Sequence, residues 1–183
     1  MRFFKSSRMG GSVAVISAAL VALVPASAQA ASGGMGPDSA TPVPTVPGQK
    51  AKLVKGIAYA PKSAPQEVKD IIAAANRIRN KPYIYGGGHG SFNDKGYDCS
   101  GAVSYALHGA DLLSTPLDSG SLAKWGSPGS GEWVSVYGAR SHAYMVVAGL
   151  RFDTSMTPGN GPGWSKSMRS TPESYKVRHP AGL

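Results

Sequence analysis

The sequence contains one cysteine, Cys99, within the stretch "GYDCSGAVSYAL". Apolar residues after it recur at helical spacing, which predicts a helix that begins at Cys99. The unpaired N–H groups and positive dipole of a helix N-terminus favour a thiolate over a thiol and can bind an oxyanion. These features indicate a cysteine nucleophile, with Asp98 and Ser100 suited to the helix start and Gly101 allowing a substrate to approach. The alternative is a small buried hydrophobic residue, the usual role of an unpaired cysteine.

A thiolate nucleophile needs a base that protonates the leaving amine, usually a histidine oriented by a third polar group. The chain has four histidines, and His142 opens the apolar strand "HAYMVV", a rigid place from which to present an imidazole. His89 in a glycine-rich loop and His179 in "RHP" remain alternatives, whereas His108 lies about 13 Å along the cysteine's own helix. Asp153, in the next short strand "RFDTS", faces His142 if the two strands pair as a hairpin.

Neither a metal site nor a cofactor is predicted. One cysteine and scattered histidines provide no pair at the spacing of zinc ligands. The run "GGGHG" is not followed by the Lys-Ser/Thr of a phosphate-binding loop or by Rossmann spacing. We interpret these glycines as shaping a turn beside the cysteine, and Tyr85, just before them, as a core or supporting residue.

The N-terminal residues 1–30 have the three parts of a secretory signal peptide. Three basic residues precede an apolar run that is too short to span a bilayer, and small residues up to Ala30 offer cleavage sites. We therefore expect a secreted, extracellular protein without stable membrane insertion after cleavage. Residues 31–50, rich in Gly, Pro, Ser and Thr, predict a flexible linker, and residues 51–64 predict an extended arm or a short strand.

The composition is basic, with 19 Lys and Arg against 10 Asp and Glu and a formal net charge of +9 at pH 7. A basic surface suits polyanionic partners, which for a secreted protein means anionic cell-envelope polymers rather than nucleic acid. No nucleic-acid-binding motif is present and the basic residues are scattered, so ordinary solubility is the alternative explanation. We expect a monomer.

Residues 65–183 predict one domain with helices first and strands afterwards, an order typical of the α+β class. The first helix follows Ser63, a candidate N-cap, and carries an apolar stripe from Val68 to Ile78. After the helix at Cys99, the runs "EWVSVYG", "HAYMVVAGL" and "RFDTS" predict strands, and one more strand is possible near the C-terminus.

Four stretches resemble the NlpC-type family of papain-like bacterial cell-wall cysteine peptidases: "KPYIYGGG", "GYDCSGAVSYAL", "HAYMVV" and "RFDTS". The resemblance covers roughly residues 65–155. It implies helices packed on an antiparallel sheet, with the nucleophile Cys99 at a helix N-terminus and the base His142 on a facing strand. It also assigns the third polar position, often His, Asn or Gln in the family, to Asp153, and the tyrosine beside the nucleophile to Tyr83.

The same resemblance implies a cell-wall hydrolase that cleaves peptidoglycan stem peptides between D-isoglutamate and the diamino acid, through a Cys-His-Asp thiolate mechanism and an acyl-enzyme. Tyr83, Asp98 and Ser100 are the predicted substrate-binding residues, and no cofactor is required. Two alternatives stay open. A non-catalytic cell-envelope-binding protein can use the same scaffold with a misaligned site, and an acyltransferase needs the same three residues but passes the acyl group to another acceptor.

Overall fold

The computed structural model describes residues 44–155, 161–170 and 174–183. All of them belong to the second of the chain's two compact units, Met35–Leu183. The predicted signal peptide and residues 31–43 of the predicted linker lie outside the described residues. Among the residues described, no helix has both the length and the apolar character needed to cross a membrane.

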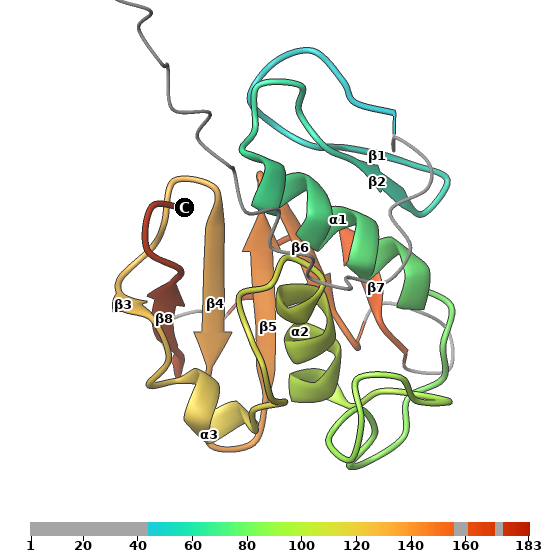
Figure 1. Cartoon of the computed structure of the whole chain (residues 1–183), viewed down its shortest axis with the longest axis vertical. Coiled ribbons are helices and arrows are strands. Elements are labelled where there is room, and N and C mark those ends of the chain that lie inside the picture. The colour runs from blue at the N-terminus through green and yellow to red at the C-terminus, as the bar shows by residue number, and fades with distance from the viewer. Residues whose placement is uncertain (1–43, 156–160, 171–173) are drawn as a thin grey trace, which may run out of the picture. The chain divides into compact units, whose positions relative to one another are not determined.

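A six-stranded sheet forms one layer of the fold, with every neighbouring pair of strands antiparallel (Figure 1). Its order is β3-β8-β4-β5-β6-β7. The bounds are β3 Ser127–Pro128, β4 Val134–Gly138, β5 Ala143–Val147, β6 Leu150–Asp153, β7 Gly163–Ser165 and β8 Lys176–His179. The prediction of helices combined with an antiparallel sheet is confirmed.

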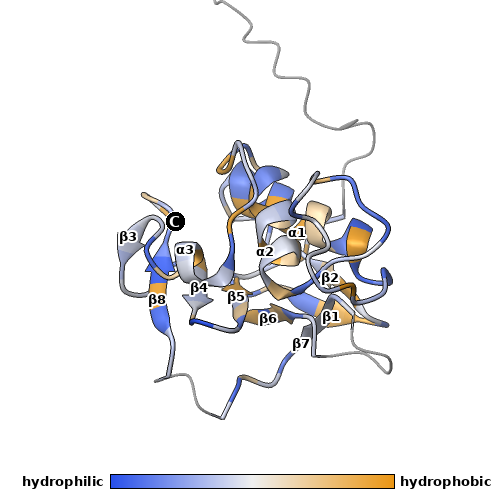
Figure 2. Ribbon diagram, turned by 90° about the horizontal axis from the view of Figure 1, so that it is seen from below, coloured by the Kyte–Doolittle hydropathy of each residue, from blue (hydrophilic) through white to orange (hydrophobic). Residues whose placement is uncertain are grey.

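Two helices, α1 (Gln66–Ile78) and α2 (Cys99–His108), pack against each other and lie over one face of the sheet, with α2 against β5 and β6 (Figure 1). Figure 2 shows the helices as a layer above the strands, with hydrophobic stretches in both layers. The short α3 (Ser119–Leu122) follows the end of this layer. Fully buried side chains join the helices and the strands in one core: Val68, Ile71, Ile72, Val103, Leu107, Val136, Met145 and Phe152.

Strands β5 and β6 form a tight hairpin, which brings the ends of the two strands together. Val147 pairs with Leu150, so the connection consists of Ala148 and Gly149 alone. Both turn residues have positive φ angles, 45° and 85°, the backbone shape that matches the right-handed twist of paired strands. Because this turn sets the register, Asp153 at the end of β6 lies beside the residues that begin β5.

The segment before α1 forms strands, one of the two alternatives predicted for it. Residues 51–64 contain a two-stranded antiparallel hairpin, β1 (Lys52–Val54) and β2 (Ile57–Tyr59), rather than an extended arm. Val46, within the predicted linker, exchanges backbone hydrogen bonds with residues 60 and 62 and is therefore part of the folded unit. The two added strands satisfy backbone groups that an isolated arm would leave to water.

The predicted cap of the first helix is also wrong. Pro65 is the N-cap residue of α1 and no side chain caps the helix. The Ser63 hydroxyl instead donates to the carbonyl oxygen of Gly48, 3.0 Å away. Proline is tolerated at a helix start because the N–H that it lacks would have no helical partner there.

Candidate active site

Cys99 is the first residue of α2, and its side chain is buried, with 8% of the residue exposed. The preceding residue, Asp98, is the N-cap, and its Oδ1 accepts a hydrogen bond from the backbone N–H of Gly101 at 2.7 Å. An aspartate N-cap is among the strongest helix-start signals, because its carboxylate satisfies an otherwise unpaired backbone N–H group. The sequence Asp-Cys-Ser-Gly therefore determines that the thiol sits in the first helical turn.

The thiol of Cys99 meets the beginning of β5. It forms hydrogen bonds with the side chain of His142, the residue directly before β5, and with the backbone N–H of Ala143. Packing of α2 on β5 produces this contact between residues that are far apart along the chain. The thiol is thus in contact with both an imidazole and a backbone N–H donor.

The second ring nitrogen of His142 contacts a buried carboxylate. Nε2 of His142 lies 3.0 Å from Oδ1 of Asp153, whose side chain has no exposed surface. Since Nε2 faces Asp153, Nδ1 is the nitrogen left for the thiol. This linear order of thiol, imidazole and carboxylate is the arrangement in which the imidazole transfers a proton and the carboxylate orients it.

Electrostatics in this group favour an ion pair of thiolate and imidazolium. Burial opposes the charge on Cys99, but the hydrogen bonds from His142 and from the Ala143 N–H hold the pKa of its thiol below the ordinary value. Burial also opposes the charge on His142, yet Asp153 and Cys99 together raise its pKa to about 9. Asp153 is buried as well, and its hydrogen bonds with His142 and Arg169 keep the pKa of its carboxyl far below the usual range.

The other three histidines have different partners. His89 lies 3.0 Å from Oδ1 of Asp98 through its Nε2. Nδ1 of His108 lies 2.8 Å from the carbonyl oxygen of Leu113, and its ring stacks on Phe92. His179 is the last residue of β8, and its Nδ1 lies 3.0 Å from the carbonyl oxygen of Gly129. Of the alternatives left by the sequence, His142 is the histidine that contacts the thiol.

The two predicted substrate-binding residues beside Cys99 are engaged with the protein itself. Asp98 accepts hydrogen bonds from the backbone N–H groups of Gly86 and Gly101 and from the Ser100 hydroxyl. The Ser100 hydroxyl also lies 3.2 Å from Nε2 of His89. These contacts tie the glycine-rich loop to the start of α2. Substrate binding by Asp98 and Ser100 remains a prediction.

Gly101 has a different role from the one expected. A Cβ atom built at this position would overlap the carbonyl oxygen of Gly87, so the missing side chain lets the glycine-rich loop lie against α2. The glycine is therefore required by packing within the protein, and its role in substrate approach stays a prediction.

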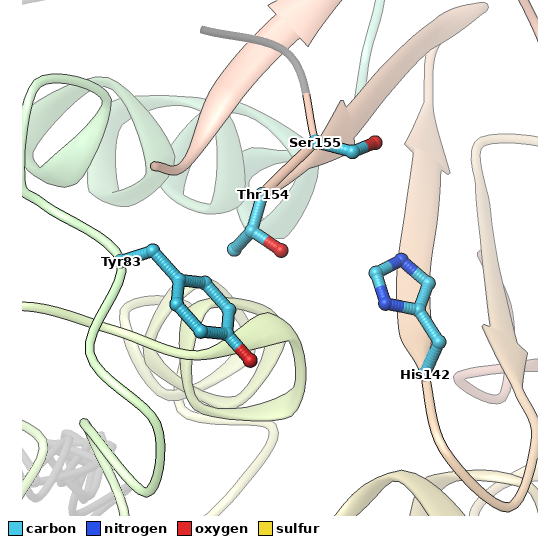
Figure 3. A pocket seen from close by; sticks show the side chains of 4 residues that line it. All are labelled: Tyr83, His142, Thr154 and Ser155. Carbon is cyan, nitrogen blue, oxygen red and sulfur yellow. The ribbon is translucent and has the colours of Figure 1, made fainter. Parts of the chain in front are cut away.

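A pocket of about 210 Å³ lies on the His142 side of the site, lined by Tyr83, His142, Thr154 and Ser155 (Figure 3). Tyr83 and His142 lie on opposite sides of it, with Thr154 between them in this view. Burial and the charge of Cys99 raise the pKa of the Tyr83 hydroxyl, which therefore remains protonated and able to donate a hydrogen bond. Tyr85, expected to be core or support, is 91% exposed.

Sequence reasoning missed three contributors to the site. One is the Ala143 backbone N–H at the thiol, which only the packing of α2 on β5 reveals. The others are Arg169 and Arg151, which approach Asp153 at 2.9 Å and 3.8 Å. Arg151 opens the stretch "RFDTS" but was given no role, and no motif marked Arg169. Within the described residues, no group of three or more His, Cys, Asp or Glu side chains is arranged to hold a metal ion.

The protonation states predict how fast Cys99 reacts with iodoacetamide. An ordinary thiol has a pKa of about 8.5, so at pH 7 we expect Cys99 to react about tenfold faster than an unhindered model thiol. A second increase in rate is expected near pH 9, where His142 loses its proton and the thiolate loses its counter-charge. Stopped-flow alkylation across pH 4–10 measures both steps. In His142→Gln, the pH of the first step should rise towards the pKa of the model thiol. An unchanged pH profile would contradict the ion pair.

No protein-family model and no curated protein sequence matches the chain, whereas several solved structures are similar to it. One similar structure is the peptidoglycan hydrolase RipB of Mycobacterium tuberculosis, at 22% identity over 62% of this chain and 64% of that one, with a TM-score of 0.49. Another is RipD of the same organism, described as a non-catalytic NlpC/p60 domain protein adapted to peptidoglycan binding. Its identity is 20%, over 63% of this chain and 98% of RipD, with a TM-score of 0.47.

The NlpC-type family recurs among the structural neighbours. The Resuscitation Promoting Factor Interacting protein RipA is a further neighbour, at 23% identity over 62% of each chain and a TM-score of 0.47. This chain spans less than two thirds of the length of the RipB structure and of this RipA structure.

Proposed function

We propose that the chain is a secreted NlpC-type cysteine hydrolase that cleaves amide bonds in peptidoglycan stem peptides. The observation that carries the proposal is the contact of the Cys99 thiol, in the first turn of α2, with His142, whose Nε2 lies 3.0 Å from buried Asp153. The substrate class rests on the resemblance of the motifs around these residues to that family.

In the first half of the proposed reaction, the Cys99 thiolate attacks the carbonyl carbon of the scissile amide. The carbonyl oxygen becomes an oxyanion, which backbone N–H groups at the start of α2 stabilise. The Gly101 N–H is already taken by Asp98, so the N–H groups of Cys99 and Ser100 are the ones we assign to the oxyanion. His142 then gives its Nδ1 proton to the amine, the C–N bond breaks and a thioester with Cys99 remains.

In the second half, neutral His142 takes a proton from water at Nδ1 while the water oxygen attacks the thioester carbonyl. Collapse of the second oxyanion breaks the C–S bond and releases the carboxylic acid product, which loses its remaining proton to solvent. Cys99 and His142 return to the thiolate and the imidazolium. Throughout, Asp153 keeps the ring in the orientation that directs Nδ1 at the sulfur.

Digestion of purified peptidoglycan tests the proposal. Soluble products are identified by mass spectrometry, with protein alkylated at Cys99 as the matched control. We expect new peptide fragments from the unmodified protein alone, ending at D-isoglutamate. A protein that releases nothing although Cys99 alkylates rapidly acts on another substrate or transfers the acyl group to another acceptor. A protein that releases nothing and has an unreactive thiol is a binding protein, as RipD is described to be.

A further inference from the structure

Arg169 contacts both His142 and Asp153. Its Nε donates to Oδ2 of Asp153 at 2.9 Å and its Nη2 to Oδ1 at 3.3 Å, so the guanidinium grips the carboxylate with two nitrogens. The same Nη2 lies 2.7 Å from Nε2 of His142 and 3.1 Å from the Ser155 hydroxyl. Arg169 is therefore a fourth member of the group formed by Cys99, His142 and Asp153.

Two tyrosine rings hold the guanidinium in this position. Its central carbon lies 5.4 Å from the ring centre of Tyr144, in β5, and 6.0 Å from that of Tyr175. The two rings meet edge to face at 5.0 Å, and Tyr137 stacks on Tyr144 at 4.4 Å. Attraction between a cation and aromatic faces adds to the two hydrogen bonds, which makes this a prepared site for an arginine.

The permanent charge of Arg169 matters when His142 is neutral. The Asp153 side chain is fully buried, and an unpaired buried carboxylate is costly. In the thiolate state, imidazolium compensates the carboxylate, but that compensation ends each time His142 gives its proton away. An arginine keeps its charge at any pH at which the protein folds, so Asp153 stays ionised in both states.

Arg169 also competes with Asp153 for the same nitrogen of His142. When Nε2 carries a proton, it donates to Asp153, and the nearby Nη2 cannot hydrogen-bond to it. When Nε2 is bare, Nη2 can donate to it instead. The proton that His142 transfers is the one on Nδ1, and Nε2 keeps its own. The positive charge of Arg169, 2.7 Å from the ring, is therefore what opposes the imidazolium that Asp153 and Cys99 favour.

We propose that Arg169 is a positioning residue that keeps Asp153 ionised and in place and, by its positive charge beside the ring, weakens the hold of His142 on its Nδ1 proton. The inference rests on the proposed role of His142 as the proton donor to the leaving amine. A donor that holds its proton less tightly transfers it more readily, so Arg169 offsets the strong stabilisation of the imidazolium by Asp153.

Several other groups that face His142 also affect its pKa. Each of them is the same in all the variants compared below, and the Cys99 thiol is absent from all of them. The thiol of Cys99 faces Nδ1. The Tyr175 ring lies edge to face at 6.3 Å, Tyr83 lies across the pocket, and Arg151 stands 3.8 Å behind the carboxylate of Asp153. The Ser155 N–H donates to Oδ1 at 3.3 Å, so besides His142 the carboxylate keeps two partners, Ser155 and Arg151, when Arg169 is removed.

The test is an NMR titration of the His142 imidazole nitrogens in the full chain carrying Cys99→Ala, so that no thiol titrates beside it. The His142 signals are assigned by their loss in His142→Gln. Adding Arg169→Gln is expected to raise the pKa of His142 by about one unit, the scale of a nearby charge. Arg169→Lys keeps the charge but not the two-nitrogen grip, and a smaller rise is expected. The matched control, Arg140→Gln, removes an equal charge from an exposed residue near His142 and should leave the pKa unchanged within about 0.3 units.

An unchanged or lower pKa of His142 in Arg169→Gln would overturn the assignment, because a purely structural arginine would release Asp153 and weaken the imidazolium. If Arg169→Gln does not fold, Arg169→Lys is used instead, and a rise in the pKa of His142 supports the proposal while an unchanged or lower pKa overturns it. The titration needs no peptidoglycan. If the protein digests no peptidoglycan but the pKa of His142 rises in Arg169→Gln, the proposed hydrolase is refuted and the role of Arg169 is retained. If the protein digests peptidoglycan but the pKa does not rise, the role of Arg169 is refuted and the hydrolase is retained.

Discussion

Replacement of Cys99 by alanine is expected to reduce release of peptides from peptidoglycan by at least about 10³-fold. The sulfur is the atom that forms the thioester, and it is the nucleophile that hydrogen-bonds to His142. The fold should survive, because Cys99 is small and alanine suits a helix, so we expect the free energy of unfolding to change by less than about 1 kcal/mol. Mass spectrometry of the soluble products and denaturant unfolding measure the two quantities.

Cys99→Ser provides the sharper comparison. It keeps a nucleophilic atom of similar size, but a hydroxyl is far less acidic than a thiol and His142 cannot hold it ionised. We expect its activity to be close to that of Cys99→Ala. Full hydrolysis by either variant would exclude the proposed mechanism, since the acyl group would then be carried elsewhere or not at all.

Replacement of Asp153 by asparagine is expected to lower hydrolysis by about 10²–10⁴-fold. The amide keeps the size of the carboxylate but removes the charge that raises the pKa of His142. The imidazolium is then less stable, the thiol is ionised less and the ring can turn. Alkylation of Cys99 at pH 7 should slow in the same variant, which ties the loss of activity to the ion pair.

The same substitution should lower the free energy of unfolding by about 2 kcal/mol, because it leaves the partly buried Arg169 without its buried partner. Asp153 has a lowered pKa in the folded protein. Its stabilisation is therefore complete above the unfolded value of about 3.9 and declines as the pH falls below it. The stability difference between the native protein and Asp153→Asn should shrink below about pH 4. Asp111→Asn, the same change at an exposed position, is the control and should show neither effect.

Prediction from sequence was most accurate where the cause is local. The start of α2 was predicted because Asp98 caps it through the Gly101 N–H, an interaction within one turn. The helix α1 was predicted from its apolar stripe, but its cap was not. Ser63 bonds instead to Gly48, a partner that a local pattern cannot contain. Tyr85 was expected to be a core or supporting residue and is 91% exposed, since aromatic character alone does not determine burial.

By itself, the sequence determined two parts of the site: a thiol in a first helical turn, and a histidine and an aspartate on adjacent strands joined by the two-residue turn Ala148–Gly149. Both depend on interactions between neighbouring residues, for which spacing is sufficient. The position of His142 and the family resemblance favoured this histidine as the partner of Cys99. Only the tertiary structure shows the contact itself, because it requires α2 to pack on β5. Only the tertiary structure revealed Arg169, because Tyr144, Tyr175 and Asp153 hold it from separate segments, and their convergence depends on how the sheet and its connections pack.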